Sequence, residues 1–410
     1  MKTSRRTLLK RSLGFAAAPA LIFPQRRTSD AHAESEERMR VEKNLTKSDL
    51  VTPCLVLDLD AFEANVAKMA AHCKASNINL RPHGKSHKCV EIAQRQRKAG
   101  AIGLSVATIR EAEAMAAAGI KGMLITSELV GRPKIERLLR VLRKAPDTMA
   151  VVDNLAHAQE LNDAAAAAKL KLNVLIDVDP GGKRTGVASG APTIAFAEKL
   201  MKLPHLKLLG FHCYSGTSAH IAGFEARRQH SSNAMTPAIE TFAQLKQRGL
   251  PMDILSGGST GTYNIDPGFN GMTELQCGSY VFMDVEYINI GGQRDAKLYD
   301  DFQSSLTVMA TVISRNHPDR ATTDAGIKSF ATDRKFGPDF KDLKGARVFI
   351  SSDEHGTVML DNPSREVKLG DRLEFIIPHC DPNVNLYDRM YCVRGEKVVD
   401  AWRIVGRHGD

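Results

Sequence analysis

The chain has 410 residues, 43% of them hydrophobic and 25% charged, with a formal net charge of +9 at pH 7. This length accommodates two domains of ordinary size. The seven cysteines are dispersed, odd in number and without a Cys-x-x-Cys pair, which indicates neither a disulfide framework nor a zinc knuckle. No basic stripe is interleaved with aromatic residues, so we expect no nucleic acid partner.

The N-terminal residues 1–33 have the features of an export signal. Arg5 and Arg6 form a twin-arginine pattern, the apolar run Leu13–Phe23 is too short to span a bilayer, and Ala31–Ala33 is typical of a cleavage site. This leader holds seven of the 56 Lys and Arg residues and one of the 47 Asp and Glu residues, so its removal leaves a formal charge of +3. We expect a periplasmic protein, exported by the twin-arginine route, with no membrane contact after cleavage.

Eight short apolar runs follow, separated by segments rich in Ala, Leu, Lys and Glu with helical periodicity. Strands that alternate with helices predict a parallel sheet, and eight of them over about 200 residues predict an α/β fold with a closed, TIM-like (β/α)8 barrel. In one helical segment, Thr108 can cap the start and Gly119 the end. The eight runs are Asn79–His83, Gly103–Ala107, Gly122–Thr126, Ala150–Asp153, Leu172–Asp179, Leu208–Tyr214, Met252–Ser256 and Glu274–Gly278.

Lys85 follows the first of these runs and has basic neighbours, among them Arg81 and Lys88. Active-site groups of such barrels lie at the carboxyl ends of the strands. Burial and adjacent positive charge can lower the pKa of a lysine from its usual value of about 10.4, which frees the nucleophilic amine that a Schiff base requires. A solvated basic loop would contain the same residues, and the position of Lys85 in the strand count favours the reactive amine.

Small and hydroxyl-bearing residues follow the seventh and eighth runs, where barrels often bind phosphate. The segment Ser256–Thr262 combines glycines, which permit close backbone approach, with hydroxyl and N–H groups that can bind an anion. A nucleophilic lysine and a phosphate cradle on one rim indicate pyridoxal 5'-phosphate (PLP). The expected cofactor contacts in these segments are Gly257, Gly258, Ser259, Thr260 and Tyr280.

The barrel is expected to span residues 58–292, and residues 293–410 are expected to form a second, β-rich domain to which residues 50–57 add a strand. Within that domain, residues 371–381 are predicted to form a strand. Positions i and i+2 of a strand point to one face, so His379 and Asp381 would project together and Cys380 would turn away. An imidazole beside a carboxylate supplies half a shell for a divalent metal, with other positions open for water and substrate.

Four segments of the chain carry a family resemblance: Thr52–Asp58, Arg81–Lys88, Ser256–Thr260 and Pro378–Leu386. They resemble the D-threonine aldolase and D-serine dehydratase group of fold-type III PLP enzymes, whose wider relative is alanine racemase. The resemblance runs from about residue 50 to residue 405. It implies a PLP barrel followed by a β-rich domain, with Lys85 as the Schiff-base lysine. It also implies that Arg184 lies near the cofactor ring, that Tyr214 contacts this ring, and that His220 is catalytic.

The order His-Cys-Asp at 379–381 is that of the aldolase branch, whereas D-serine dehydratases of this group have cysteine in place of Asp381. Oxygen ligands suit manganese or magnesium, and a thiolate favours zinc. The resemblance therefore implies a D-threonine aldolase type lyase that uses PLP and manganese or magnesium to cleave D-3-hydroxy amino acids to glycine and an aldehyde, with His220 accepting the hydroxyl proton.

Three alternatives stay open from the sequence: a D-serine or 3-hydroxy-D-aspartate dehydratase, a 3-hydroxy-D-aspartate aldolase, and a PLP-binding protein without catalytic activity. The expected partners are a small-molecule D-3-hydroxy amino acid and a second copy of the chain in a homodimer.

Overall fold

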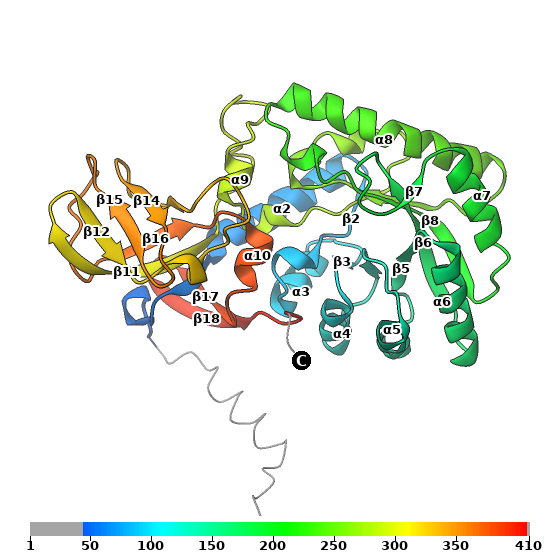
Figure 1. Ribbon diagram of the computed structural model, residues 1–410, viewed down its shortest axis with the longest axis horizontal. Helices are drawn as coiled ribbons and strands as arrows, with labels where there is room; N and C mark the ends of the chain where they lie inside the picture. The colour runs from blue at the N-terminus through cyan, green and yellow to red at the C-terminus, as the bar shows by residue number, and fades with distance from the viewer. Residues whose placement is uncertain (1–43, 408–410) are drawn as a thin grey trace, which may run out of the picture. The chain divides into compact units, whose positions relative to one another are not determined.

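Eight parallel strands curl into a ring in the computed structural model, which describes residues 44–407 (Figure 1). The strand order is β2-β10-β9-β8-β6-β5-β4-β3, and the two end strands are joined by hydrogen bonds from Ile102 N to Leu80 O at 2.8 Å and from Ser105 N to Pro82 O at 2.9 Å. All eight predicted strands are present, and the expected barrel is confirmed. They are β2 Asn79–Leu80, β3 Leu104–Val106, β4 Met123–Ile125, β5 Met149–Val152, β6 Leu172–Asp179, β8 Leu206–Cys213, β9 Ile254–Gly257 and β10 Glu274–Leu275, and the short β7 Val187–Ala188 pairs with β6.

Helices surround these strands (Figure 1), and four of the nine α-helices within residues 44–407 begin at a side-chain cap. The Thr108 hydroxyl accepts the Glu111 N–H at 3.3 Å at the start of α4, and Gly119, with φ +77°, follows the end of this helix, as predicted. Asp58 caps α2 in the same way, by accepting the Asp60 N–H at 3.1 Å. The helices are α2 Leu59–Ala75, α3 Val90–Lys98, α4 Ile109–Ala117, α5 Arg132–Lys144, α6 Leu155–Ala167, α7 Ala191–Leu200, α8 Phe224–Gln247, α9 Val285–Ile288 and α10 Cys380–Val384.

The C-terminal region forms a second, mixed sheet with the order β14-β15-β12-β11-β1-β17-β18, and β16 pairs with both β11 and β13. Strand β1 precedes the barrel in the chain but lies in this sheet, antiparallel to β11 and parallel to β17. The strands are β1 Cys54–Asp58, β11 Leu306–His317, β12 Arg320–Thr323, β13 Asp339–Phe340, β14 Arg347–Ile350, β15 Gly356–Met359, β16 Arg372–Ile376, β17 Arg389–Arg394 and β18 Lys397–Arg403.

One hydrophobic core cluster joins the barrel to the second sheet, since it includes Leu80 of β2, Tyr280 after β10, Leu306 of β11 and Phe375 of β16. The described residues accordingly fall within one compact unit. All seven cysteines are buried and free. Within residues 44–407, no helix has both the length and the apolarity needed to cross a bilayer. The predicted leader lies outside the described residues.

Candidate active site

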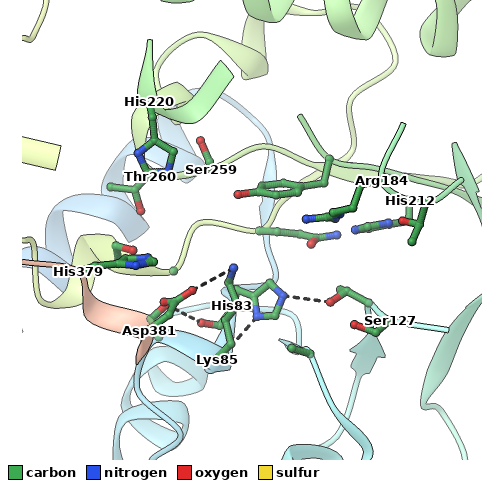
Figure 2. A pocket seen from close by; sticks show the side chains of 18 of the residues that line it. His83, Lys85, Ser127, Arg184, His212, His220, Ser259, Thr260, His379 and Asp381 are labelled. Atoms are coloured by element: carbon green, nitrogen blue, oxygen red, sulfur yellow. Dashed lines mark hydrogen bonds and ion pairs between the residues drawn. The ribbon is translucent and has the colours of Figure 1, made fainter. Parts of the chain in front are cut away.

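A cavity of about 430 Å³ opens at the carboxyl ends of the barrel strands (Figure 2). In Figure 2, His379 and Asp381 face Arg184 and His212 across the cavity, and Lys85 lies between the two groups. The sequence therefore predicted a set of side chains that meet in one place. The predicted residues that line the cavity are Lys85, Arg184, Tyr214, His220, Ser259, Thr260, His379 and Asp381.

Lys85 lies on a single 3-10 turn, Gly84–Ser86, that follows β2. The His83 side chain caps this turn by accepting the Lys85 N–H at 3.4 Å. The Lys85 amine forms an ion pair with Asp381, with Nζ 3.0 Å from Oδ2. A lysine after a barrel strand thus faces a carboxylate from the C-terminal region.

The expectation that basic neighbours lower the pKa of Lys85 is wrong for this state of the protein. The negative charge of Asp381 raises the pKa of Lys85, and it outweighs burial, which acts in the opposite direction. The basic neighbours Arg81 and Lys88 each pair with a buried glutamate of the barrel, so their charges are compensated. For Asp381, burial opposes ionisation, but the Lys85 charge prevails and lowers the pKa to about 2.

His379 and Asp381 do not lie on a strand, which corrects the prediction for residues 371–381. Strand β16 ends at Ile376, and His379 is the N-cap of α10. Pro378 cannot donate to a sheet ladder, and buried Asp284 accepts the Cys380 N–H at 2.9 Å at the start of the helix. Both predicted side chains nevertheless line the cavity, and Cys380 is fully buried with Sγ directed toward a backbone carbonyl.

His220 ends the 3-10 turn Ser218–His220, which follows β8, and its ring centre lies 4.8 Å from that of Tyr287. Burial and then the positive charges of Arg334 and His379 lower the pKa of His220 to about 4. The imidazole is therefore neutral near pH 7 and can accept a proton.

Arg184 and Tyr214 lie together on the opposite part of the rim. Arg184 is in the loop between β6 and β7, with Cζ 5.4 Å from the centre of the Tyr214 ring. Lys85 Nζ lies 5.9 Å from the same ring centre. Two cations thus contact an aromatic face that directly follows β8.

Three expected cofactor contacts do not line the cavity. A Cβ on Gly257 would lie 2.2 Å from the Cys213 carbonyl oxygen, and one on Gly258, where φ is +75°, would lie 2.8 Å from a Leu275 methyl carbon. These glycines permit close packing beneath the cradle and do not form its surface. The Tyr280 hydroxyl accepts a hydrogen bond from Gln96 at 3.0 Å, away from the cavity, and Gly278 and Ser279 line the cavity instead.

Several lining residues were missed by the sequence reasoning. His83 and His212 could have been predicted from the sequence, because His83 follows β2 and His212 lies near the end of β8. No local pattern marks Arg334, which comes from the loop before β13. The missed lining residues include His83, His212, Gln276, Tyr287 and Arg334.

A group of three carboxylates adjoins the cavity, which Glu128 lines: Glu128, Asp153 and Asp177 have oxygen atoms within 4.8 Å of one another. Asp177 is already bonded to His212 Nδ1 at 2.6 Å and to the Thr185 hydroxyl at 2.7 Å. Burial and then the charges of Asp177 and Asp153 raise the pKa of Glu128 to about 7. A proton on Glu128 relieves the repulsion within the group.

Comparisons with known proteins agree with this arrangement. The family model "Alanine racemase, N-terminal domain" matches residues 57–286, and "Putative serine dehydratase domain" matches residues 305–393. A D-threonine aldolase of Arthrobacter sp is 37% identical, over 87% of this chain and 92% of its own length. A 3-hydroxy-D-aspartate aldolase of Paracoccus denitrificans is 32% identical, over 88% and 94%.

Among solved structures, the D-threonine aldolase of Filomicrobium marinum superimposes with a TM-score of 0.83 at 34% identity, covering 88% of this chain and 97% of that protein. The family matches, the sequence relatives and the fold therefore coincide over nearly all of the described residues. The chain belongs to the D-threonine aldolase and D-serine dehydratase family of fold-type III PLP enzymes, which share the barrel of alanine racemase.

Proposed function

We propose that this protein is a PLP- and divalent-metal-dependent aldolase that cleaves D-3-hydroxy amino acids to glycine and an aldehyde. The observation that carries the proposal is the 3.0 Å approach of Lys85 Nζ to Asp381 Oδ2 in a cavity that also contains His220 and His379. An amine suited to hold PLP, an oxygen and a nitrogen suited to bind a metal, and a neutral imidazole occupy one site. The two aldolase relatives support this reading.

The cavity residues fit PLP. Lys85 would hold the cofactor through its amine, and Ser259, Thr260 and Ser279 surround the space for a phosphate at the ends of β9 and β10. A Cβ on Gly278 would lie 2.2 Å from Ser86 Oγ, so glycine is required for the cradle to approach the lysine turn this closely. Arg184 and Tyr214 would contact the ring.

The metal donors also fit. Asp381 Oδ1 is buried and has no hydrogen-bond partner among the described residues, and a bound cation would satisfy this oxygen. His379 contributes a nitrogen from the adjacent turn. A set of one nitrogen and one carboxylate oxygen, without a thiolate because Cys380 faces the core, favours manganese or magnesium over zinc.

The residues of the chain have distinct tasks in this reaction. PLP supplies the electron sink that stabilises negative charge at the substrate Cα. His379 and Asp381 would orient the β-hydroxyl of the substrate, and His220, neutral because its pKa is about 4, would accept the hydroxyl proton as the Cα–Cβ bond breaks.

A product assay tests the proposal. Purified protein loaded with PLP would be given D-threonine, D-serine and 3-hydroxy-D-aspartate, with glycine and keto acid both quantified. Glycine is expected as the main product, and chelation should stop turnover until manganese or magnesium is restored, while PLP stays bound. Mainly keto acid would establish the dehydratase alternative. Absence of turnover with every substrate and metal would favour a PLP carrier.

The division into a barrel at 58–292 and a β-rich domain at 293–410, the homodimer and the periplasmic location belong to the same proposal. The location rests on the twin-arginine pattern and the predicted cleavage site in residues 1–33. Replacing Arg5 and Arg6 by lysine should retain the protein in the cytoplasm, and cell fractionation that is unchanged would contradict the export proposal. Size-exclusion chromatography with light scattering measures the assembly.

A further inference from the structure

Three side chains that the sequence reasoning missed form one connected group beside His220 and His379, two of the four histidines that line the cavity. Arg334 Nε lies 2.9 Å from Glu286 Oε2 and 3.3 Å from Asp333 Oδ2. Glu286 Oε2 in turn lies 3.5 Å from His220 Nδ1, and Asp333 Oδ2 lies 2.8 Å from His379 Nδ1. We call Glu286, Arg334 and Asp333 the carboxylate–arginine bracket.

Hydrogen-bond chemistry assigns the proton on His379. A carboxylate only accepts, so the 2.8 Å contact with Asp333 requires that His379 Nδ1 carries the hydrogen. The Arg334 Nε–H is directed at the same nitrogen over 3.3 Å, and it cannot donate there once Nδ1 bears a hydrogen; a small rotation of the guanidinium would turn this N–H to Glu286 Oε2, which lies 2.9 Å from Nε. The lone pair of the neutral ring is then on Nε2, which is the nitrogen left for a metal.

The same logic applies to His220. Its Nδ1 is buried and makes no hydrogen bond within residues 44–407. Nδ1 lies 3.5 Å from Glu286 Oε2, which forms an ion pair with Arg334 and has a further lone pair that can accept. A small closing movement would let Nδ1–H donate to Glu286, which would leave Nε2 as the basic nitrogen.

The bracket is fixed to the backbone that carries His379. Glu286 is on α9, whose N-cap Asp284 accepts the Cys380 N–H at 2.9 Å. Just before Asp333, the Ala331 N–H donates at 2.9 Å to Asn383, on α10. Both carboxylates approach one guanidinium nitrogen, so they lie close together, and the Arg334 charge compensates their mutual repulsion.

We propose that the carboxylate–arginine bracket positions both histidines: Asp333 holds His379 for the metal, Glu286 holds His220 as the base, and Arg334 holds the two carboxylates in place. The inference rests on the proposed function, because it assumes that His379 binds the metal and that His220 is the base. These three are positioning residues and need not touch the substrate.

Two measurements on PLP-loaded protein test the roles of the bracket at His379 and at His220 separately. The first is the Kd for Mn²⁺ after chelation, measured by equilibrium dialysis, which needs no turnover. The second is kcat for glycine release at saturating Mn²⁺. Arg347→Gln is the matched control, since Arg347 pairs with Asp361 on the exposed surface of the second sheet.

Asp333→Ala should raise the Kd for Mn²⁺ by about 10- to 100-fold, the effect typical of losing the partner of a metal-binding histidine. Asp333→Asn should restore part of this affinity, because its amide oxygen can still accept from Nδ1–H. Glu286→Ala, which removes the acceptor, should leave the Kd within about twofold and lower kcat at least tenfold, since a misplaced base affects only the chemical step. Arg334→Gln should weaken both, and Arg347→Gln neither.

A wild-type Kd for Mn²⁺ in Asp333→Ala would overturn the role of Asp333 at His379, and a wild-type kcat in Glu286→Ala would overturn the role of Glu286 at His220. Equal losses of both quantities in all three bracket variants would show a general structural effect and also overturn the proposal. If Asp333→Ala does not fold, the nearly isosteric Asp333→Asn is measured instead. An unchanged Kd for Mn²⁺ in Asp333→Asn would show that the charge of Asp333 does not position His379. If the wild-type protein releases keto acid, the aldolase proposal is refuted but the bracket proposal is not, because the Kd for Mn²⁺ is measured without turnover.

Discussion

Arg227→Met is expected to lower the free energy of unfolding by about 3 kcal/mol. Arg227, on α8, is fully buried and donates hydrogen bonds to the backbone carbonyls of Ile221 at 2.8 Å, Gly261 at 2.7 Å and Gly291 at 2.8 Å. Methionine fills a similar volume but leaves these oxygens without their donor, at about 1–3 kcal/mol each. Removal of the buried charge also relieves a desolvation penalty of several kcal/mol. The net loss in the free energy of unfolding therefore lies near the lower end of the total cost for the three oxygens.

Urea denaturation followed by circular dichroism measures this loss. Arg228→Gln is the control, because the Arg228 side chain is 54% exposed and, within residues 44–407, pairs only with nearby Glu225. Retention of PLP should fall as well in Arg227→Met, since the released loops directly follow His220 and Thr260. A loss below about 1 kcal/mol, within the range of ordinary surface substitutions, would refute the reasoning that Arg227 secures these loops.

Three further predictions concern the cavity. Lys85→Ala should abolish both turnover and the visible absorbance of lysine-bound PLP, and borohydride trapping of PLP on another lysine would show the assignment to be wrong. Gly278→Ala should weaken PLP retention, measured by dialysis, because the added Cβ displaces the Ser86 hydroxyl and with it the lysine turn, whereas Gly268→Ala, where a Cβ meets nothing within 4 Å, should behave as wild type. The pKa of Glu128, raised from 4.5 to about 7, means that the folded state keeps a proton that the unfolded state releases, so this contribution to stability is full below pH 4.5 and is lost as the pH rises through 7. Glu128→Gln should therefore have a higher Tm than wild type at pH 8 by a margin that shrinks toward pH 5, and an equal margin at both pH values would contradict the shift.

The sequence identified features that depend on local order along the chain. Alternating apolar runs and helical segments determine a (β/α)8 barrel, and chain order then places Lys85, Tyr214 and Ser259 at strand ends on one rim. Local chemistry also predicted the helix cap at Thr108, which needs only a hydroxyl and the following N–H groups.

The sequence was wrong where tertiary contacts override local pattern. Residues 371–381 alternate like a strand, but the buried carboxylate of Asp284, 96 residues earlier, accepts the Cys380 N–H and the chain turns into α10. The pKa of Lys85 rises because Asp381 faces it from the other end of the chain, a contact that basic neighbours in sequence could not reveal. Tyr280, on the 3-10 turn Ser279–Val281, packs into the hydrophobic core and meets Gln96 there, a residue 184 positions earlier in the chain.

The carboxylate–arginine bracket could not be predicted from local sequence either. Glu286, Asp333 and Arg334 have no motif, since a glutamate in a short helix and an Asp-Arg pair in a loop occur in any soluble protein. Only the shared core of barrel and second sheet brings α9, the loop before β13 and α10 together. The sequence by itself thus determined the barrel and the place of Lys85, Tyr214 and Ser259 on its rim, because these follow from strand order. The charge state of the site and the groups that contact its histidines were decided by tertiary structure, because electrostatic interactions depend on distance in space and not on separation along the chain.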